Sequence, residues 1–327
     1  MDRTIVRHLL DAMPGFVSGE TLADILGVSR VSIWGHLEKL KEHGFVVEAI
    51  RNKGYRLVAL PPRLDERLLQ VFLLRERIHA PLHFLEETDS TNSVGERLLA
   101  DGAETPAIVV ARRQLAGRGR FGRVWHSADG ECLTFSLCFR PHLTPAEMQR
   151  FTLWMGLSLC RHLEESHGLD VAVKWPNDLM VNQRKLAGML TEARVDADRT
   201  RDLIFGLGIN INGRLNRWPK EAASRAITVE QACGGPVEIN AFSANLIAAA
   251  LHAYEAFADG SHRAVFDRYW REHDLLANQP VCLTHLGQNH HGTACGITDN
   301  GSLRVRLDDG REQTFPAGEV TLSPPRP

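Results

Sequence analysis

Positively charged side chains and glycines alternate in one short stretch of this sequence. Residues 114–125 read QLAGRGRFGRVW and contain Arg118, Arg120 and Arg123. Glycine lets the backbone approach a ligand closely, and the forked guanidinium of arginine suits carboxylate and phosphate oxygens. The stretch therefore predicts a loop that binds an anion. An Arg/Gly run is equally typical of a flexible nucleic-acid-binding tail, but this one is short, follows an apolar run and ends in Trp125, so we expect it inside a fold.

A second charged cluster lies further along the chain. Residues 174–180 read KWPNDLM and follow the apolar run 171–173, which places Lys174 at a strand end near Asp178. Such a lysine can neutralise charge that develops on a phosphate. A lone Lys and Asp at this spacing more often form a solvated surface ion pair worth about 0–1 kcal/mol. The proline-fixed turn and Trp175 favour the positioned lysine over that alternative.

The common phosphate-binding motifs are absent from the sequence. It contains neither GxxxxGK[ST] nor a GxGxxG that opens a helix after a strand. Residues 185–192 (KLAGMLTE) and 206–212 (GLGININ) offer backbone access and amide groups, although glycines in strands more often mark bulges or close packing. Residues 88–92 (TDSTN) predict a helix cap, and they also supply hydroxyl groups for the lip of a pocket.

The N-terminal part predicts a winged helix-turn-helix. Apolar residues recur at helical spacing over residues 3–13 and predict a first helix. A second helix is expected to end at Leu26, and Ser29 is expected to cap a third helix that ends at residues 43–44. Runs 45–47 and 55–58 read as two strands of a wing. The residues expected to face DNA lie on the third helix and the wing: Ser29, Arg30, Ser32, His36, Lys39, Arg51 and Lys53.

Later composition predicts two further domains of an α+β protein. Pro61 and Pro62 form a stiff break, after which helical stretches mix with β-rich runs at 107–110, 133–139 and 203–211. From Gln279 onward, brief apolar runs separated by Gly, Asn and Asp predict a small β-barrel. We expect domain boundaries that divide the chain into residues 1–62, 63–275 and 276–327.

Composition limits the classes of function. Among 327 residues, 38 Lys and Arg stand against 40 Asp and Glu, so any nucleic-acid site must be local. The six cysteines never form a CxxC pair, which argues against a zinc ribbon or a disulfide framework. The short apolar run at the start of the sequence argues against a signal peptide, and no apolar stretch approaches the roughly 20 residues of a membrane span. We expect a cytoplasmic protein with no membrane contact.

TDSTN, GRGRxGRxW, KWPNDL, KLAG and GLGIN occur in an order and spacing that resemble biotin protein ligases. The helix-turn-helix and the closing barrel resemble the bifunctional type that also represses biotin-synthesis genes. The resemblance spans essentially the whole chain. It implies a class II synthetase-like mixed sheet and an SH3-like barrel. It also implies two half-reactions, in which biotin and ATP form biotinyl-5′-AMP and a carrier lysine then takes the biotin.

The resemblance assigns roles to individual residues. The implied catalytic residues are Arg118, Arg120, Lys174 and Asp178. The implied biotin-binding residues are Ser90, Thr91, Asn92, Gln114, Gly117, Arg118, Lys174 and Gly188. The residues implied for ATP and Mg²⁺ are Arg120, Arg123, Trp125, Asn177, Asp178 and Asn210, with Asp178 and Asn210 nearest the metal. The implied partners are biotin, ATP, the biotin carboxyl carrier protein of acetyl-CoA carboxylase, operator DNA and, with adenylate bound, a second copy of the chain.

Two alternatives and one departure from the family pattern stay open. The central domain could sense a small acid without chemistry, or adenylate another acid such as lipoate; Lys174 and GRGRxGRxW favour the biotin ligase. In the third helix, Gly35 stands where relatives commonly have lysine or another helix former. A glycine there costs about 1 kcal/mol relative to alanine and removes a phosphate contact. A winged helix that only packs on the catalytic domain is the alternative to DNA binding.

Overall fold

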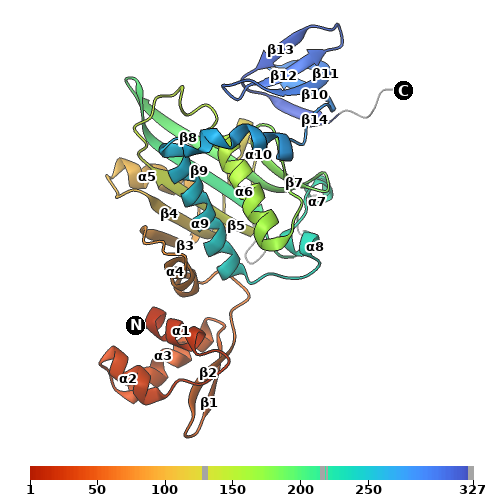
Figure 1. Cartoon of the computed structure of the whole chain (residues 1–327). Helices are drawn as coiled ribbons and strands as arrows, with labels where there is room; N and C mark the ends of the chain where they lie inside the picture. The colour runs from red at the N-terminus through yellow and green to blue at the C-terminus, as the bar shows by residue number, and fades with distance from the viewer. Residues whose placement is uncertain (127–131, 214–217, 219, 323–327) are drawn as a thin grey trace. The chain divides into compact units, whose positions relative to one another are not determined.

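The structure is a computed structural model that describes residues 1–126, 132–213, 218 and 220–322 (Figure 1). The chain divides into two compact units: unit one comprises residues 1–79 and 238–248, and unit two comprises residues 80–237 and 249–327. The three-domain boundaries expected from the sequence stay a prediction. Among the described residues, no helix has both the length and the apolar character needed to cross a bilayer.

Unit one begins with the expected winged helix-turn-helix. Its three helices are α1 (Asp2–Asp11), α2 (Gly19–Leu26) and α3 (Arg30–Glu42), and its wing is the antiparallel pair β1 (Val46–Ile50) and β2 (Gly54–Ala59). The hydroxyls of Ser18 and Ser29 accept hydrogen bonds from the amides of Thr21 and Ser32, at 2.9 and 3.1 Å. These caps satisfy helix N–H groups that otherwise lack partners.

The core of unit one is larger than the sequence predicts. Leu68 and Val71 of α4 (Glu66–Arg75) pack in the same apolar cluster as α1, α2 and α3. The first turns of α9 (Ile239–Ala258) also belong to this unit. There Asn240 accepts a hydrogen bond from the Asp65 amide (2.7 Å) and donates to the Arg63 carbonyl (3.2 Å). Segments 175 residues apart therefore belong to one compact unit.

Unit two contains the expected mixed sheet of seven strands, in the order β3-β4-β5-β9-β8-β7-β6. β3 and β4 run parallel, and every other neighbouring pair is antiparallel. The strands are β3 (Leu82–Thr88), β4 (Ala107–Gln114), β5 (Cys132–Phe139), β6 (Ala172–Lys174), β7 (Asp178–Val181), β8 (Arg184–Asp196) and β9 (Arg199–Asn210).

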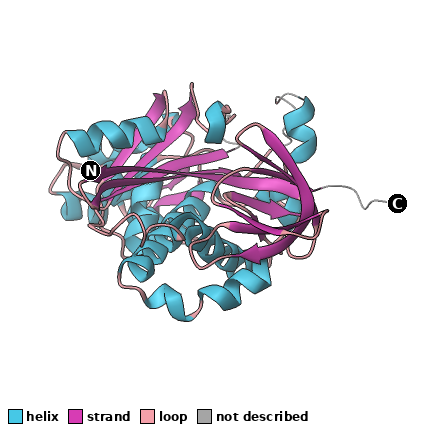
Figure 2. Ribbon diagram, turned by 90° about the horizontal axis from the view of Figure 1, so that it is seen from above, coloured by secondary structure: helices cyan, strands magenta, loops and turns pink. Residues whose placement is uncertain are grey.

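Helices cover both faces of this sheet (Figure 2). On one face, Gly95 of α5 (Thr91–Ala100) packs closely on Cys138 and Ile204. On the other, Phe151 of α6 (Phe151–His167) meets Phe205 edge to face, at 6.0 Å between ring centroids. The shorter helices are η1 (Arg120–Gly122), α7 (Lys220–Arg225), α8 (Val229–Cys233), η2 (Ser261–Ala264) and α10 (Phe266–His273).

The TDSTN motif precedes a helix as expected, with Ser90 at the N-cap position of α5. The side-chain cap expected there is wrong, because the side chain of Ser90 makes no capping hydrogen bond.

The C-terminal part of unit two is a five-stranded antiparallel sheet in the order β13-β12-β11-β10-β14. Leu283, Val305 and Phe315 are fully buried within it. The last strand was not expected from the sequence, although Pro316 and Gly318 stand just before it as turn signals. The strands are β10 (Pro280–His285), β11 (Gln288–Ile297), β12 (Leu303–Leu307), β13 (Glu312–Phe315) and β14 (Glu319–Leu322).

Two glycines of unit one give opposite expectations for alanine. Gly54 has a φ of +104°, and a Cβ there would lie 2.1 Å from the Val17 carbonyl oxygen. We expect Gly54→Ala to lower the free energy of unfolding by about 1–3 kcal/mol. Gly35 lies inside α3, and a Cβ there would meet open space. We therefore expect Gly35→Ala to raise the free energy of unfolding by about 0.5–1 kcal/mol. Urea titration of the full chain measures both changes, and two changes of the same sign would contradict these expectations.

Candidate active site

The register of the seven-stranded sheet gathers the motifs on one face. Residues directly opposite each other in antiparallel strands share a face. A first cross-strand row runs Ser136, Gly206, Leu190 over β5, β9 and β8. A second row runs Thr134, Gly208, Gly188, Asp178 and Lys174 over β5, β9, β8, β7 and β6. Residues from the KWPNDL, KLAG and GLGIN motifs are therefore neighbours in the second row.

Two glycines of β9 let side chains lie directly on this sheet. A Cβ at Gly206 would sit 2.2 Å from Asn92 Oδ1, and a Cβ at Gly208 would sit 2.3 Å from Cε2 of the Trp125 indole. Asn92 thus covers the first row and Trp125 the second. The GLG run marks close packing, which was the structural alternative weighed for it in the sequence.

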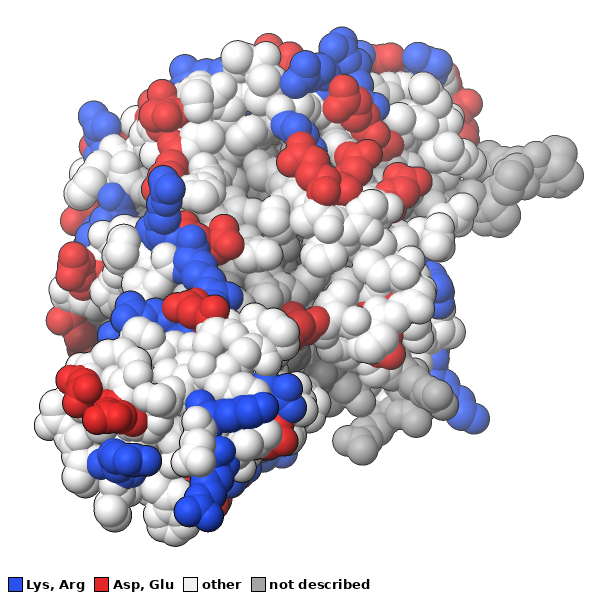
Figure 3. Space-filling view, turned by 60° about the horizontal axis from the view of Figure 1, so that its bottom comes forward, with Lys and Arg blue, Asp and Glu red and all other residues white. Residues whose placement is uncertain are grey.

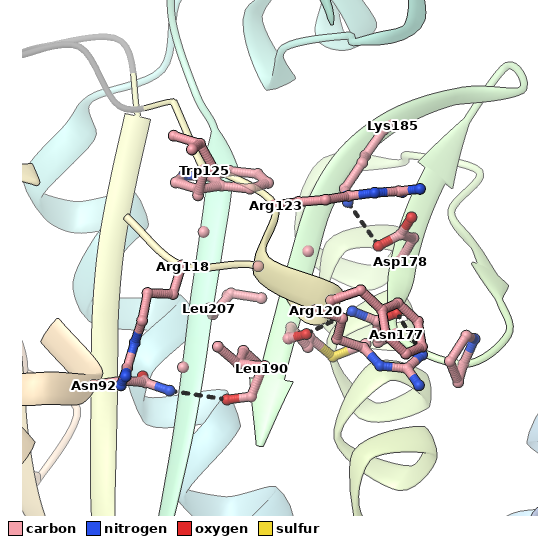
Figure 4. A pocket seen from close by; sticks show the side chains of 18 of the residues that line it. Asn92, Arg118, Arg120, Arg123, Trp125, Asn177, Asp178, Lys185, Leu190 and Leu207 are labelled. Carbon is pink, nitrogen blue, oxygen red and sulfur yellow. Dashed lines mark hydrogen bonds and ion pairs between the residues drawn. The ribbon is translucent and has the colours of Figure 1, made fainter. Parts of the chain in front are cut away.

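Above these rows lies a cavity of about 170 Å³, seen in close-up in Figure 4. It brings together twelve of the residues expected in the site: Ser90, Thr91, Asn92, Gln114, Arg118, Arg120, Arg123, Trp125, Lys174, Asn177, Asp178 and Gly188. Arg118 and Lys174 line the same cavity, as cooperation between them requires.

Two expected residues, Gly117 and Asn210, do not line this cavity. The carbonyl of Gly117 accepts a hydrogen bond from the Trp125 amide at 2.9 Å, and a Cβ at Gly117 would meet the Trp125 carbonyl oxygen at 2.5 Å. Gly117 therefore lets the loop fold back on itself. Asn210 is 1% exposed and donates to the carbonyls of Lys185 and Ile227. It connects segments beneath the pocket.

Each arginine of residues 114–125 has a different partner. An Arg118 Nη atom lies 3.0 Å from a carboxylate oxygen of Glu192, and its side chain runs toward Asn92 (Figure 4). Arg120 lies 4.8 Å from the Phe121 ring centroid, and its Nη1 is 3.4 Å from Asn177 Oδ1. Arg123 forms an ion pair with Glu319 of β14. These contacts place the loop inside the fold, as expected, and exclude a free tail.

The lysines at the second row differ in their pairing. Lys185 Nζ lies 2.7 Å from Asp178 Oδ1 and 5.6 Å from the centroid of the Trp125 ring. Lys174 stands opposite Asp178 in the register but has no ion pair within 4.0 Å among the described residues. The ion pair considered for Lys174 and Asp178 is therefore formed by Lys185 and Asp178 instead. Burial lowers the pKa of Lys174 below the ordinary lysine value, against the opposing effect of Asp178.

The same electrostatic environment acts on the arginines and their acidic partners. Burial lowers the pKa of Arg120. The hydrogen bond from Arg123 lowers the pKa of the Glu319 carboxyl below its usual value, so this ion pair persists into acidic solution. The described residues contain no cluster of three or more His, Cys, Asp or Glu side chains suited to a metal ion.

Sequence reasoning missed four residues that hold this site together. Lys185 lies in the quoted KLAG motif, and Glu192 follows it, but neither had been assigned a role. Ser136 lies inside an apolar strand, and Glu319 lies in the strand that the pattern did not predict. Only the register of the sheet and the chain's return through β14 bring these residues to the pocket.

The residues expected to face DNA divide into two groups. Arg30, Lys39, Arg51 and Lys53 are exposed, as a DNA-binding face requires. Ser29 serves as the cap of α3, and Ser32 donates its amide to that cap. His36 turns to Asp2, with 2.6 Å between Nδ1 and Oδ1. Across the molecular face in Figure 3, basic and acidic side chains are interspersed.

Comparisons with known proteins decide the family. The profile of the Biotin/lipoate A/B protein ligase family matches residues 84–210, a helix-turn-helix domain profile matches 2–56, and the biotin protein ligase C-terminal domain matches 277–323. A bifunctional ligase/repressor BirA of Bacillus subtilis is 32% identical over 302 residues, covering 92% of this chain and 93% of that protein. The chain belongs to the BirA family of biotin protein ligases.

Other members of the family agree with this assignment. The biotin–[acetyl-CoA-carboxylase] ligase of Paracoccus denitrificans is 31% identical over 239 residues, covering 72% of this chain and 98% of that protein. The solved biotin protein ligase of Aquifex aeolicus, in complex with biotin and ATP, superposes with a TM-score of 0.62 at 27% identity. The superposition covers 74% of this chain and 98% of the Aquifex aeolicus chain. The expected α+β architecture of this BirA-family chain is confirmed, with its helix-turn-helix, mixed-sheet ligase domain and small C-terminal β domain.

The lowered pKa of Lys174 has a consequence for stability. In the folded protein, burial disfavours the charged ammonium, whereas above the ordinary lysine value of 10.5 the group is neutral in both states. We expect Lys174→Met to be more stable than wild type at pH 7, with the advantage shrinking as pH rises through the lowered pKa toward 10.5. Urea titrations at a series of pH values test this, with the exposed Lys220→Met as control. A pH-independent difference would contradict it.

Proposed function

We propose that this chain activates biotin with ATP to biotinyl-5′-AMP and then transfers biotin to a lysine of the biotin carboxyl carrier protein of acetyl-CoA carboxylase. As a member of its family, the chain is an ATP-dependent biotin ligase. The observation that carries the proposal is the second cross-strand row, which sets Lys174 and Asp178 in the cavity closed by the arginine loop. The complex of the Aquifex aeolicus relative with biotin and ATP supports the choice of ligands.

The arrangement suits a reaction between two anions. A carboxylate can attack an α-phosphate only if their mutual repulsion is offset. Arg120 and Lys174 are partly buried cations in the same cavity. Preorganised charge in a site that excludes water acts more strongly than the same charge in bulk solvent. We assign Lys174 to both reacting anions, Arg118 to the biotin carboxylate, and Arg120 and Arg123 to the phosphates.

A magnesium ion fits this site in one particular way. Mg²⁺ is usually held by one or two carboxylates together with substrate phosphates and water, not by a complete protein cage. Asp178 lines the cavity and agrees with that mode, whereas Asn210 is 1% exposed and does not line the cavity. When bound, the ion would neutralise phosphate charge. We also assign to Asp178 the acceptance of a proton from the carrier lysine.

We expect Lys174→Ala to reduce kcat for carrier biotinylation by about 10²–10³-fold, the scale observed when one stabilising donor is removed from a transition state. Label on a carrier domain and release of pyrophosphate measure the two half-reactions separately. Lys220→Ala, an exposed lysine of the same unit, is the control. Absence of label from the wild type would leave the sensory alternative, and equal use of lipoate would indicate a ligase of another specificity.

We further propose that the chain represses biotin genes as a homodimer that forms when biotinyl-5′-AMP is bound. The helix-turn-helix match supports this role, with Arg30 and Lys39 on α3 and Arg51 and Lys53 on the wing as contacts. The apolar side chains of Val31 and Trp34, 77% and 57% exposed, lie on the same helix. They would face base edges, since the start of a recognition helix enters the major groove.

Replacing both Arg51 and Lys53 by alanine should weaken binding to operator DNA about equally at all sequences. The slope of log affinity against log salt should fall by about 1 for each lost phosphate contact. Fluorescence anisotropy at several salt concentrations, with and without biotin plus ATP, measures both effects. A winged helix that only packs on the catalytic domain would bind no DNA under either condition, and an unchanged slope would remove these residues from the interface.

A further inference from the structure

The exposed face of helix α3 carries apolar side chains in its N-terminal half. Val31 is 77% exposed, the highest fraction of any large apolar side chain described in unit one, and Trp34 is 57% exposed. Positions i, i+3 and i+4 of a helix are neighbours on one face, so Gly35 lies beside both. Ile33 and Leu37, on the other side of α3, are buried in the core of unit one. Val31, Trp34 and Gly35 thus form an apolar face of α3 that points away from this core.

Nothing in the fold of unit one requires a glycine at position 35. Gly35 lies inside α3, has no positive φ, and a Cβ there would meet open space. Glycine inside a helix is less stable than alanine, because it loses more backbone freedom on folding. A glycine also lets another molecule approach the backbone closely. The missing side chain therefore suits a partner from outside the chain that touches α3 at this point.

The charges near the apolar face indicate what this partner is. Four exposed cations lie on the same helix and on the wing: Arg30, Lys39, Arg51 and Lys53. Among the described residues, none of the four forms an ion pair within 4.0 Å. A partner that matches this surface must combine negative charge with small apolar groups. Duplex DNA has both, because its backbone carries phosphates and the C5-methyl group of thymine is the apolar group that base edges display in the major groove.

We infer that Val31 and Trp34 recognise thymine methyl groups of the operator, and that Gly35 admits such a methyl group against the backbone of α3. The inference rests on the proposed repressor function and names the base that this helix selects. An A·U pair presents the same hydrogen-bond donors and acceptors in the major groove as an A·T pair and lacks only the C5-methyl group. The recognised group can therefore be removed from DNA without changing its hydrogen bonding.

The test uses a duplex that the wild-type full chain selects from a random-sequence DNA library in the presence of biotin and ATP. The selected duplex is resynthesised with uracil in place of thymine at one position at a time, and its affinity is measured by fluorescence anisotropy. We expect wild-type binding to weaken about fourfold at each thymine whose methyl group is contacted, the factor that corresponds to burial of one such group. Random-sequence duplexes that contain thymine or uracil should bind equally well.

Protein variants identify the residues that contact the methyl groups. Val31→Ala and Trp34→Ala should bind the selected duplex about fourfold more weakly or worse, and uracil at the contacted positions should then cause little further loss. Gly35→Ala should lower affinity for the selected duplex while raising the free energy of unfolding, so loss of folding cannot explain its weaker binding. Val58→Ala, at a 51% exposed valine of the wing, is the control and should keep the wild-type dependence on thymine methyl groups.

Three outcomes would overturn the inference. The first is unchanged affinity when uracil replaces every thymine of the selected duplex. The second is equal weakening of selected and random-sequence duplexes by Val31→Ala or Trp34→Ala, which would assign these residues to sequence-independent contacts. The third is loss of self-association by Val31→Ala in sedimentation with biotin and ATP, which would assign the apolar face to a contact between two copies of the chain. Absence of DNA binding by the wild type would instead contradict the proposed repressor function, before any variant is compared.

Discussion

The antiparallel register of strands β5 to β9 is the constraint on which the site depends. Direct cross-strand pairs place residues from three separate motifs in one row on one face. A slip of one residue along any strand would send its side chains to the opposite face, among the aromatic rings under α6. The glycines at positions 188, 206 and 208 then leave room for Asn92 and Trp125 to lie on the strands. The cavity is a consequence of this register and these missing side chains.

Close grouping of cations is costly, and the chain supplies internal carboxylates that offset the cost. Arg118 forms an ion pair with Glu192, Arg123 with Glu319, and Lys185 with Asp178. These pairs hold the cations near the positions where anionic substrates would meet them. Lys174 lacks such a partner among the described residues, and its lowered pKa reflects burial without a close counter-ion. Among the described residues Arg120 likewise forms no ion pair within 4.0 Å, so the charges of Lys174 and Arg120 are both available to a reacting anion.

The C-terminal sheet contributes directly to the cavity of the same unit. Glu319 and its neighbours in residues 318–320 line the cavity, and the Trp175 indole donates to the Gly301 carbonyl at 3.0 Å. The turn that carries Lys174 and Asp178 is also tied to β8, where Asn177 Nδ2 donates to the Met189 carbonyl at 2.7 Å. The residues that line the cavity are thus positioned by strands of both sheets and by the loop at residues 114–125.

Local patterns in the sequence were sufficient for many of the elements and for part of the site. Helical spacing and serine caps predicted α1 to α3, apolar runs predicted the central strands, and dense Arg, Gly and Lys motifs named twelve of the residues that line the cavity. Such features act over a few residues, so they are visible without the fold. Tertiary structure alone decided which carboxylate pairs with which cation, that Asn210 lies beneath the pocket, that His36 turns to Asp2, and that Asn92 donates to Glu192. These contacts join residues from 7 positions apart (Asp178 and Lys185) to 196 positions apart (Arg123 and Glu319), and only strand register and packing set the distances between them.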